Sequence, residues 1–141
     1  MADPYHLQRF VDAQHGVYEQ ALAELEAGHK RSHWMWFIFP QIEGLGRSDM
    51  ARRYAISGAA EAEAYLAHPV LGTRLQACAQ ALLKHAGCPA VNLLGGVDAL
   101  KLQSSMTVFS RCATSPSPYD QVLARFYDGE PDATTLFLLR A

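Results

Sequence analysis

The sequence predicts an all-α fold, a single helical domain over residues 1–141 that packs around a central aromatic segment. Three observations lead to this prediction. Apolar residues recur every three or four positions along most of the chain, which is the spacing of an amphipathic helix. Glycine, proline and helix-capping residues separate these stretches at regular intervals. Alternation of apolar and polar residues, which is typical of a half-buried strand, is nearly absent.

The first 28 residues are expected to form two helices. Asp3 can cap the first helix, and Pro4 fits its first turn, where no backbone N–H is needed. Gly16 interrupts the helical spacing and predicts a division at that point. Gly28 predicts the end of the second helix, because glycine commonly terminates a helix in the left-handed conformation.

The central segment is "HWMWFIFPQ", residues 33–41. Six consecutive apolar residues, Trp34 to Phe39, have no periodicity that separates a buried helix from a buried strand. Because the neighbouring segments are helical and no partner strand is evident, the sequence favours a short central helix that ends before Pro40. Such a helix is apolar all round, so we expect it to be mainly core, with one edge facing a pocket.

The remainder of the chain predicts further helices with loops between them. Ser48 and Ser57 are the expected caps of two short helices, and His68 is expected to cap or orient the next, which runs towards Gly87. Residues 88–96 are expected to form a connection, and Asp98 to cap a long helix. Residues 114–118 predict a loop. A short helix over residues 119–127 and a last helix opened by Pro131 complete the expected order.

Composition restricts the function. Apolar residues make up 50% of the chain and charged residues 18%, which indicates a globular protein. The formal net charge of −2 and the absence of a basic track argue against a nucleic-acid partner. No apolar run approaches the roughly 20 residues that span a bilayer, and the first residues do not resemble a secretory signal. The three cysteines form no CxxC pair. We therefore expect a cytoplasmic protein without a membrane partner.

Polar residues inside apolar stretches are the candidate binding residues, because a buried polar group needs a partner. Gln14 shares the apolar face of the first helix and suits either a ligand or a buried backbone group. His33 and Gln41 bracket the aromatic segment. An indole of Trp34 or Trp36 suits either core packing or stacking on a nucleobase.

Two further stretches carry candidate polar groups. "GLGRS", which ends at Ser48, precedes a helix start and suits either a turn or a phosphate site. "KLQSSMT" places Lys101 and Ser105 four residues apart on one helical face, with Ser104 and Thr107 nearby. A lysine can activate a serine nucleophile, but no GxSxG motif accompanies these serines, so a polar face lining a ligand cavity is favoured.

We expect no metal and no cofactor. His29 and His33 are four residues apart, but the glutamate of an HExxH motif is missing between them. The other histidines and the cysteines show no metal-ligand spacing.

Four blocks, in order along the chain, resemble the family called domain of unknown function 1810. They are "LQRFVDAQ" from Leu7, "HWMWFIFPQIEGLGRS" from His33, "YLAHPVLGTRL" from Tyr65 and "DALKLQSSMTVF" from Asp98. This resemblance implies a mainly helical fold and leaves the activity open. "RFVDAQ" and "HPVLGTRL" also resemble, more distantly, the NADAR family of helical proteins linked to NAD and ADP-ribose derivatives.

The resemblance also implies a set of site residues, which are the polar and aromatic members of these blocks. They are Arg9, Gln14, His33, Trp34, Trp36, Gln41, Ser48, Lys101, Ser104, Ser105 and Thr107. We expect them to line a pocket for a nucleotide-like ligand, ADP-ribose or an NAD derivative, with N-glycosidic hydrolysis as the first candidate reaction. The alternative is a non-catalytic protein-interaction module, and the sequence does not decide whether the protein is an enzyme.

Overall fold

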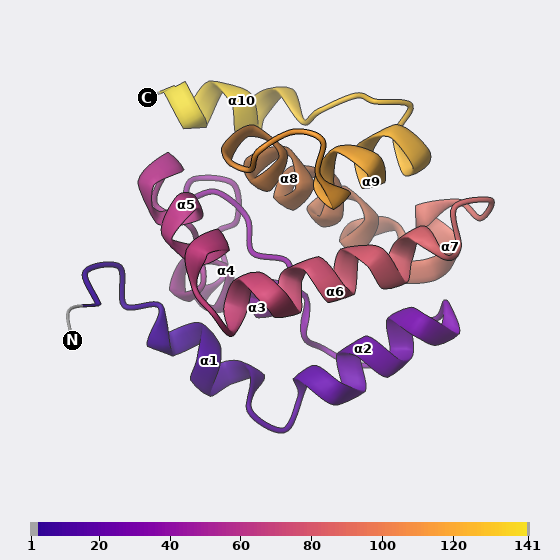
Figure 1. The fold of residues 1–141 in the computed structure, drawn as a ribbon, viewed down its shortest axis with the longest axis horizontal. Helices are drawn as coiled ribbons and strands as arrows, with labels where there is room; N and C mark the ends of the chain where they lie inside the picture. Colours follow the sequence, from indigo (N-terminus) through magenta and orange to yellow (C-terminus); the bar gives the residue numbers. More distant parts are fainter. Residues whose placement is uncertain (1–2, 141) are drawn as a thin grey trace.

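A computed structural model describes residues 3–140 (Figure 1). This part of the chain contains ten helices and no strand, which confirms the predicted all-α fold. The helices are α1 (Gln8–Gln14), α2 (Tyr18–Ala27), α3 (Met35–Ile38), α4 (Asp49–Arg53), α5 (Ala59–Ala67), α6 (Leu71–Leu83), α7 (Ala90–Leu94), α8 (Gly96–Cys112), α9 (Pro118–Phe126) and α10 (Ala133–Arg140).

Helix α6 lies in the middle of the molecule in Figure 1. Helices α1 and α2 run along one side of it, and α8, α9 and α10 lie on the other side. The described residues share one hydrophobic core, which includes side chains from most of the helices. Its largest fully buried members are Trp34, Tyr65, Phe10, Phe39, Phe109, Ile56, Leu71, Leu75, Leu82, Leu102 and Met106.

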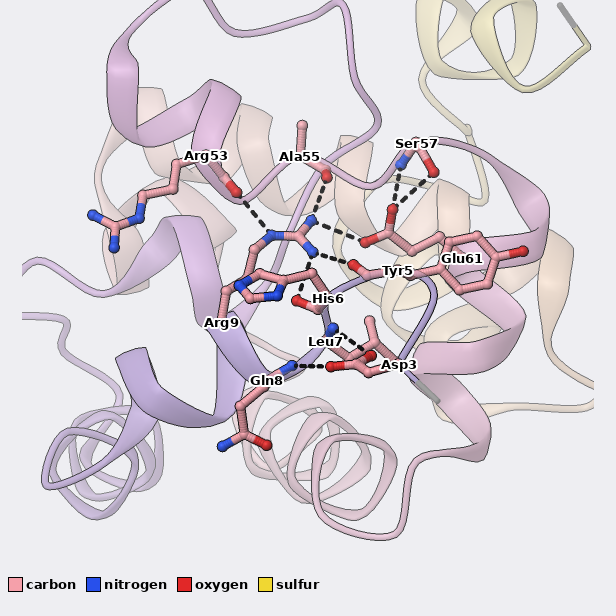
Figure 2. Close-up of polar contacts among 10 residues, drawn as sticks. All are labelled: Asp3, Tyr5, His6, Leu7, Gln8, Arg9, Arg53, Ala55, Ser57 and Glu61. Atoms are coloured by element: carbon pink, nitrogen blue, oxygen red, sulfur yellow. Dashed lines mark hydrogen bonds and ion pairs between the residues drawn. The ribbon is translucent and has the colours of Figure 1, made fainter. Parts of the chain in front are cut away.

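The N-terminal segment differs from the prediction at its start. Helix α1 begins at Gln8, not beside Pro4, because His6 has a positive φ of 51° that no helix accommodates. The Asp3 carboxylate still accepts hydrogen bonds from the backbone N–H groups of Leu7 and Gln8, at the start of the helix (Figure 2). The break near Gly16 and the end of α2 at Gly28 are confirmed, and Gly28 adopts a φ of 75°.

The aromatic segment forms the predicted short helix. Helix α3 is four residues long, and Phe37 within it and Trp34 and Phe39 at its two ends are buried. Among the six apolar residues Trp34 to Phe39, Trp36 is the one that is half-buried and not fully buried. Beyond α3, the backbone at Ile42 pairs with Ile56 in an isolated parallel bridge, which closes the loop that contains α4.

Three of the predicted helix starts need correction. Ser57 does not cap α5: its N–H and hydroxyl donate to the Glu61 carboxylate, and Gly58 occupies the cap position. Asp98 lies in the first turn of α8, which begins at Gly96. Pro131 precedes α10 without joining it, because Asp132 supplies the cap by accepting from the Thr135 N–H.

Other predicted boundaries are confirmed. The Ser48 hydroxyl accepts from the Ala51 N–H and caps α4. The His68 Nδ1 atom accepts from the N–H groups of Val70 and Leu71 at the start of α6. The expected connection over residues 88–96 instead contains α7, a single helical turn that sequence patterns rarely reveal.

Glu24 of α2 anchors the chain that enters the aromatic segment. Its carboxylate accepts the Trp34 indole N–H at 2.9 Å and the backbone N–H groups of Arg31 and Ser32 at 2.8 and 3.1 Å. The Ser32 hydroxyl also donates to it at 2.6 Å. Burial alone would raise the pKa of Glu24, but these hydrogen bonds outweigh burial and lower the pKa to about 2. The ionised carboxylate therefore stabilises the fold.

This arrangement predicts a loss of stability in acid. Because the pKa of Glu24 in the folded protein lies below its ordinary value of 4.5, the contribution of Glu24 to stability is complete above pH 4.5 and is lost as the pH falls towards 2. Urea unfolding should show that Glu24→Gln lowers stability at neutral pH by about 2–3 kcal/mol and that the difference from wild type narrows at low pH. The exposed carboxylate of Glu26 provides the control, Glu26→Gln. A constant difference across this range would contradict the role of Glu24.

Candidate functional site

A cleft with a volume of about 290 Å³ lies between α8, the start of α10 and the loop after the aromatic segment. Three of the predicted site residues, Gln41, Lys101 and Ser104, line it. Its walls are completed by apolar and polar groups, namely Leu45, Gly46, Val97, Leu100, Asp132 and Thr134. This mixture of apolar walls and a few convergent polar groups is the usual composition of a small-molecule site.

The Lys101 side chain is the only cation among the described residues that line this cleft. Its Nζ lies 5.3 Å from the centre of the Trp36 ring, so Trp36 adjoins the cleft. The nearest carboxylate oxygen in a salt bridge to Lys101 is that of Asp98, at 3.8 Å. Asp98 makes a much shorter ion pair of 2.8 Å with Lys30, whose Nζ lies 5.0 Å from the Trp34 ring centre. Asp98 is therefore a close ion-pair partner of Lys30 and only a distant one of Lys101.

The other polar groups of the cleft are held by α8 and α10. The Ser104 hydroxyl donates to the Leu100 carbonyl oxygen at 3.3 Å, a long hydrogen bond. The Thr107 hydroxyl donates to the Gln103 carbonyl oxygen and accepts from the Asp132 N–H, each at 2.8 Å. Thr107 is buried, and it fixes the backbone at Asp132 beside the cleft.

Asp132 is a cleft residue that the sequence analysis missed. One of its oxygens, Oδ2, accepts from both the N–H and the hydroxyl of Thr135, at 2.9 and 2.6 Å. The other oxygen, Oδ1, has no hydrogen-bond donor within residues 3–140. The sequence signal was an aspartate three residues before a threonine at a helix start, which predicts a cap and gives no indication of a cleft.

Ser105 is fully buried, and its Oγ has no hydrogen-bond partner within the described part of the chain. It is therefore not hydrogen-bonded to Lys101, as a serine nucleophile activated by that lysine would be. The arrangement gives no support to a Lys–Ser catalytic pair.

Two predicted residues lie in the core, away from the cleft. The Gln14 amide donates to the Phe37 carbonyl oxygen at 2.8 Å and to the Tyr65 hydroxyl at 3.4 Å, and its oxygen accepts from Arg74. Trp34 is fully buried with its indole N–H on Glu24. Both side chains therefore form hydrogen bonds with groups in the interior of the protein.

Arg9 is saturated by the protein itself (Figure 2). Its five N–H groups make five hydrogen bonds of 2.6 to 3.0 Å, so the guanidinium has no donor left for a phosphate. The acceptors are the carbonyl oxygens of Tyr5, His6, Arg53 and Ala55 and the carboxylate of Glu61. The bonds to Arg53, Ala55 and Glu61 join α1 to the end of α4, to the chain that follows it and to α5.

The remaining predicted residues lie on the surface. His33 is exposed, and Ser48 is an exposed cap of the five-residue helix α4. Among residues 3–140, no group of three His, Cys, Asp or Glu side chains is placed to hold a metal ion. No helix in the same part of the chain is long and apolar enough to cross a membrane.

Comparison with known proteins identifies the family. Residues 4–139 match the family described as "Protein of unknown function (DUF1810)", and the chain belongs to it. The chain is 46% identical to the conserved hypothetical protein Rv1873 from Mycobacterium tuberculosis, for which a crystal structure exists. The match covers 99% of both chains with a TM-score of 0.96. No curated protein matches the sequence.

Because every N–H group of Arg9 is hydrogen-bonded within the protein, we predict that replacing Arg9 lowers the stability of the fold. A lysine in Arg9→Lys offers three donors from one point and cannot serve five acceptors, so several carbonyl oxygens and Glu61 lose their partner. We expect the free energy of unfolding to fall by about 2–4 kcal/mol in urea titrations. The exposed side chain of Arg53 offers the matched control, and Arg53→Lys should change stability by less than about 0.5 kcal/mol. Equal effects of the two substitutions would contradict this role.

Proposed function

We propose that this protein binds a nucleotide-like ligand, ADP-ribose or an NAD derivative, in the cleft between α8 and α10. Lys101 would bind a phosphate oxygen. Trp36 would contact a planar ring, and Gln41 and Ser104 would supply hydrogen bonds that orient the ligand. The distant resemblance to the NADAR family supports the same class of ligand.

The observation that carries the proposal is the state of the Lys101 ammonium group. The side chain is 26% exposed, yet its Nζ makes no hydrogen bond within residues 3–140 and has only a 3.8 Å contact with Asp98. A half-buried ammonium group has lost part of its hydration and gains from an anionic acceptor. Asp98 forms its close ion pair, of 2.8 Å, with Lys30, so a phosphate that binds Lys101 would not have to displace a close ion pair of Lys101.

The shape of the cleft fits part of such a ligand better than the whole. Its volume of about 290 Å³ is at the lower limit for sites of drug-sized molecules, which have roughly 300–1,000 Å³. Leu45, Val97 and Leu100 provide apolar contacts beside the polar groups. A ribose with one attached phosphate or base would be enclosed, and the remainder of the ligand would extend along the surface.

The binding prediction is tested with Lys101→Met, which keeps most of the unbranched side chain and removes the ammonium group with its charge. Loss of one charge-assisted hydrogen bond should weaken the binding of ADP-ribose or NAD by roughly 10- to 100-fold in calorimetric titrations. The exposed Lys84, which pairs with Glu26, gives the control Lys84→Met with unchanged affinity. Unaltered binding by the Lys101 variant would place the ligand elsewhere.

We extend the proposal to hydrolysis of the N-glycosidic bond, with Asp132 as general base. A water molecule would lose a proton to the free Oδ1 atom while its oxygen bonds to the ribose C1′. The C1′–N bond would break, and its electron pair would pass to the departing base. The support for this step is a half-buried carboxylate that lines the cleft, with one oxygen hydrogen-bonded to Thr135 and the other without a donor among residues 3–140.

Asp132→Asn tests the reaction without removing the cap of α10, because asparagine also accepts from backbone N–H groups. We expect release of nicotinamide from NAD to fall about a hundredfold or more, with ligand affinity and melting temperature little changed. Product chromatography measures the rate. If wild type binds NAD and releases no nicotinamide, hydrolysis is excluded for this substrate and the binding proposal remains.

A second interpretation is a non-catalytic protein-interaction module. It is favoured by Val97 and Leu100, which are 68% and 67% exposed beside the same cleft. Large exposed apolar side chains that lie together are typical of contact surfaces. The calorimetric titrations separate the two interpretations, because failure of ADP-ribose, NAD and mononucleotides to bind wild type would favour the interaction module.

A further inference from the structure

Asp98 links two lysine–tryptophan pairs. The Lys30 Nζ lies 5.0 Å from the Trp34 ring centre, and the Lys101 Nζ lies 5.3 Å from the Trp36 ring centre. The Asp98 carboxylate contacts both ammonium groups, through Oδ2 with Lys30 at 2.8 Å and through Oδ1 with Lys101 at 3.8 Å. The two lysines therefore share one carboxylate, and the longer contact is with Lys101, the lysine that lines the cleft between α8 and α10.

Lys30 is fixed in place by short contacts of its own. Its Nζ donates to the Ser32 carbonyl oxygen at 2.7 Å, and its backbone N–H donates to the Leu93 carbonyl oxygen of α7 at 2.9 Å. The Lys30 side chain is 9% exposed, whereas that of Lys101 is 26% exposed. A lysine that is anchored at both its backbone and its ammonium group provides a fixed partner for the Asp98 carboxylate.

The contact between Asp98 and Lys101 is open although their positions favour a close one. The two residues are three apart on α8, a spacing at which oppositely charged side chains on a helix interact. Their separation of 3.8 Å is too long for a hydrogen bond. The shorter bond between Asp98 and Lys30 accounts for this geometry, because it holds the carboxylate towards Lys30.

We propose that Lys30 is a positioning residue of the nucleotide-like site, which holds Asp98 away from Lys101 and so leaves the Lys101 ammonium group available to an anionic ligand. The inference rests on the proposed function for the identity of the ligand. Two ammonium groups and one carboxylate leave this cluster with a net positive charge. Without Lys30, Asp98 and Lys101 would form a neutral pair that attracts an anion less strongly.

The affinity of the full chain for ADP-ribose, measured by calorimetry, tests the proposal in four forms. They are wild type, Lys30→Met, Asp98→Asn and the double variant. Lys30→Met should weaken binding roughly tenfold, because Asp98 then closes on Lys101. Asp98→Asn should bind at least as tightly as wild type, since it removes the competing carboxylate.

The double variant separates positioning from a structural role. It should recover the affinity lost in Lys30→Met, because no carboxylate remains to pair with Lys101. If Lys30 served only the fold, the double variant would keep the defect of Lys30→Met and would bind no better. Lys84→Met, which removes an exposed ammonium group paired with Glu26, is the charge control and should bind as wild type does.

Crystal structures of ligand-free wild type and Lys30→Met provide a measurement that needs no ligand. The distance between Lys101 Nζ and Asp98 Oδ1 should shorten from 3.8 Å to hydrogen-bond length, about 2.8 Å, in the variant. If this distance shortens and ADP-ribose binds to none of the four forms, the ligand proposal fails and the effect of Lys30 on Asp98 stands.

Three results would overturn the role of Lys30. They are a distance that stays near 3.8 Å in Lys30→Met, wild-type affinity of Lys30→Met for ADP-ribose, and a double variant that binds no better than Lys30→Met. If Lys30→Met does not fold, Asp98→Asn decides the question. Binding at least as tight as that of wild type supports competition between Asp98 and the ligand, and weaker binding overturns it.

Discussion

The structure depends on how the chain between residues 28 and 58 satisfies its backbone, because residues 34–42 within it are mostly buried and only α3 and α4 in the whole stretch are helical. An irregular buried backbone lacks internal hydrogen bonds, and each unpaired group costs about 1–3 kcal/mol. Arg9, Gln14 and Glu24, from α1 and α2, supply the missing partners. They contact, in that order, the carbonyl oxygens of Arg53 and Ala55, the carbonyl oxygen of Phe37, and the N–H groups of Arg31 and Ser32.

This constraint explains why the sequence predicts more ligand-binding residues than the cleft contains. Polar residues in apolar stretches have the same sequence signal whether they bind a ligand or a buried carbonyl group. Arg9 and Gln14 belong to the second kind in this structure, because their donors are used by backbone partners more than 20 positions away in sequence, as in the bond from Gln14 to Phe37. Periodicity gives the face on which a side chain lies and does not give the distant group that it meets.

The fold was more accessible to sequence reasoning than the site because helices are specified locally. Apolar spacing predicted most of the helices in their correct order. Gly28 marked a helix end through its backbone conformation, and Ser48 and His68 marked helix starts as capping residues. Two of the errors occurred where another side chain engages the residue that was expected to cap a helix. Aspartate and serine are both common capping residues. The Asp98 carboxylate is instead paired with Lys30, and Ser57 donates its hydrogen bonds to Glu61.

The completeness of hydrogen bonding distinguishes residues that hold the fold from those free to act on a ligand. Arg9 has five N–H groups and five acceptors, so a ligand could gain nothing there without breaking the protein's own contacts. Lys101 has three donors, a distant carboxylate and an indole face. An anion at Lys101 would add contacts without removing any short one.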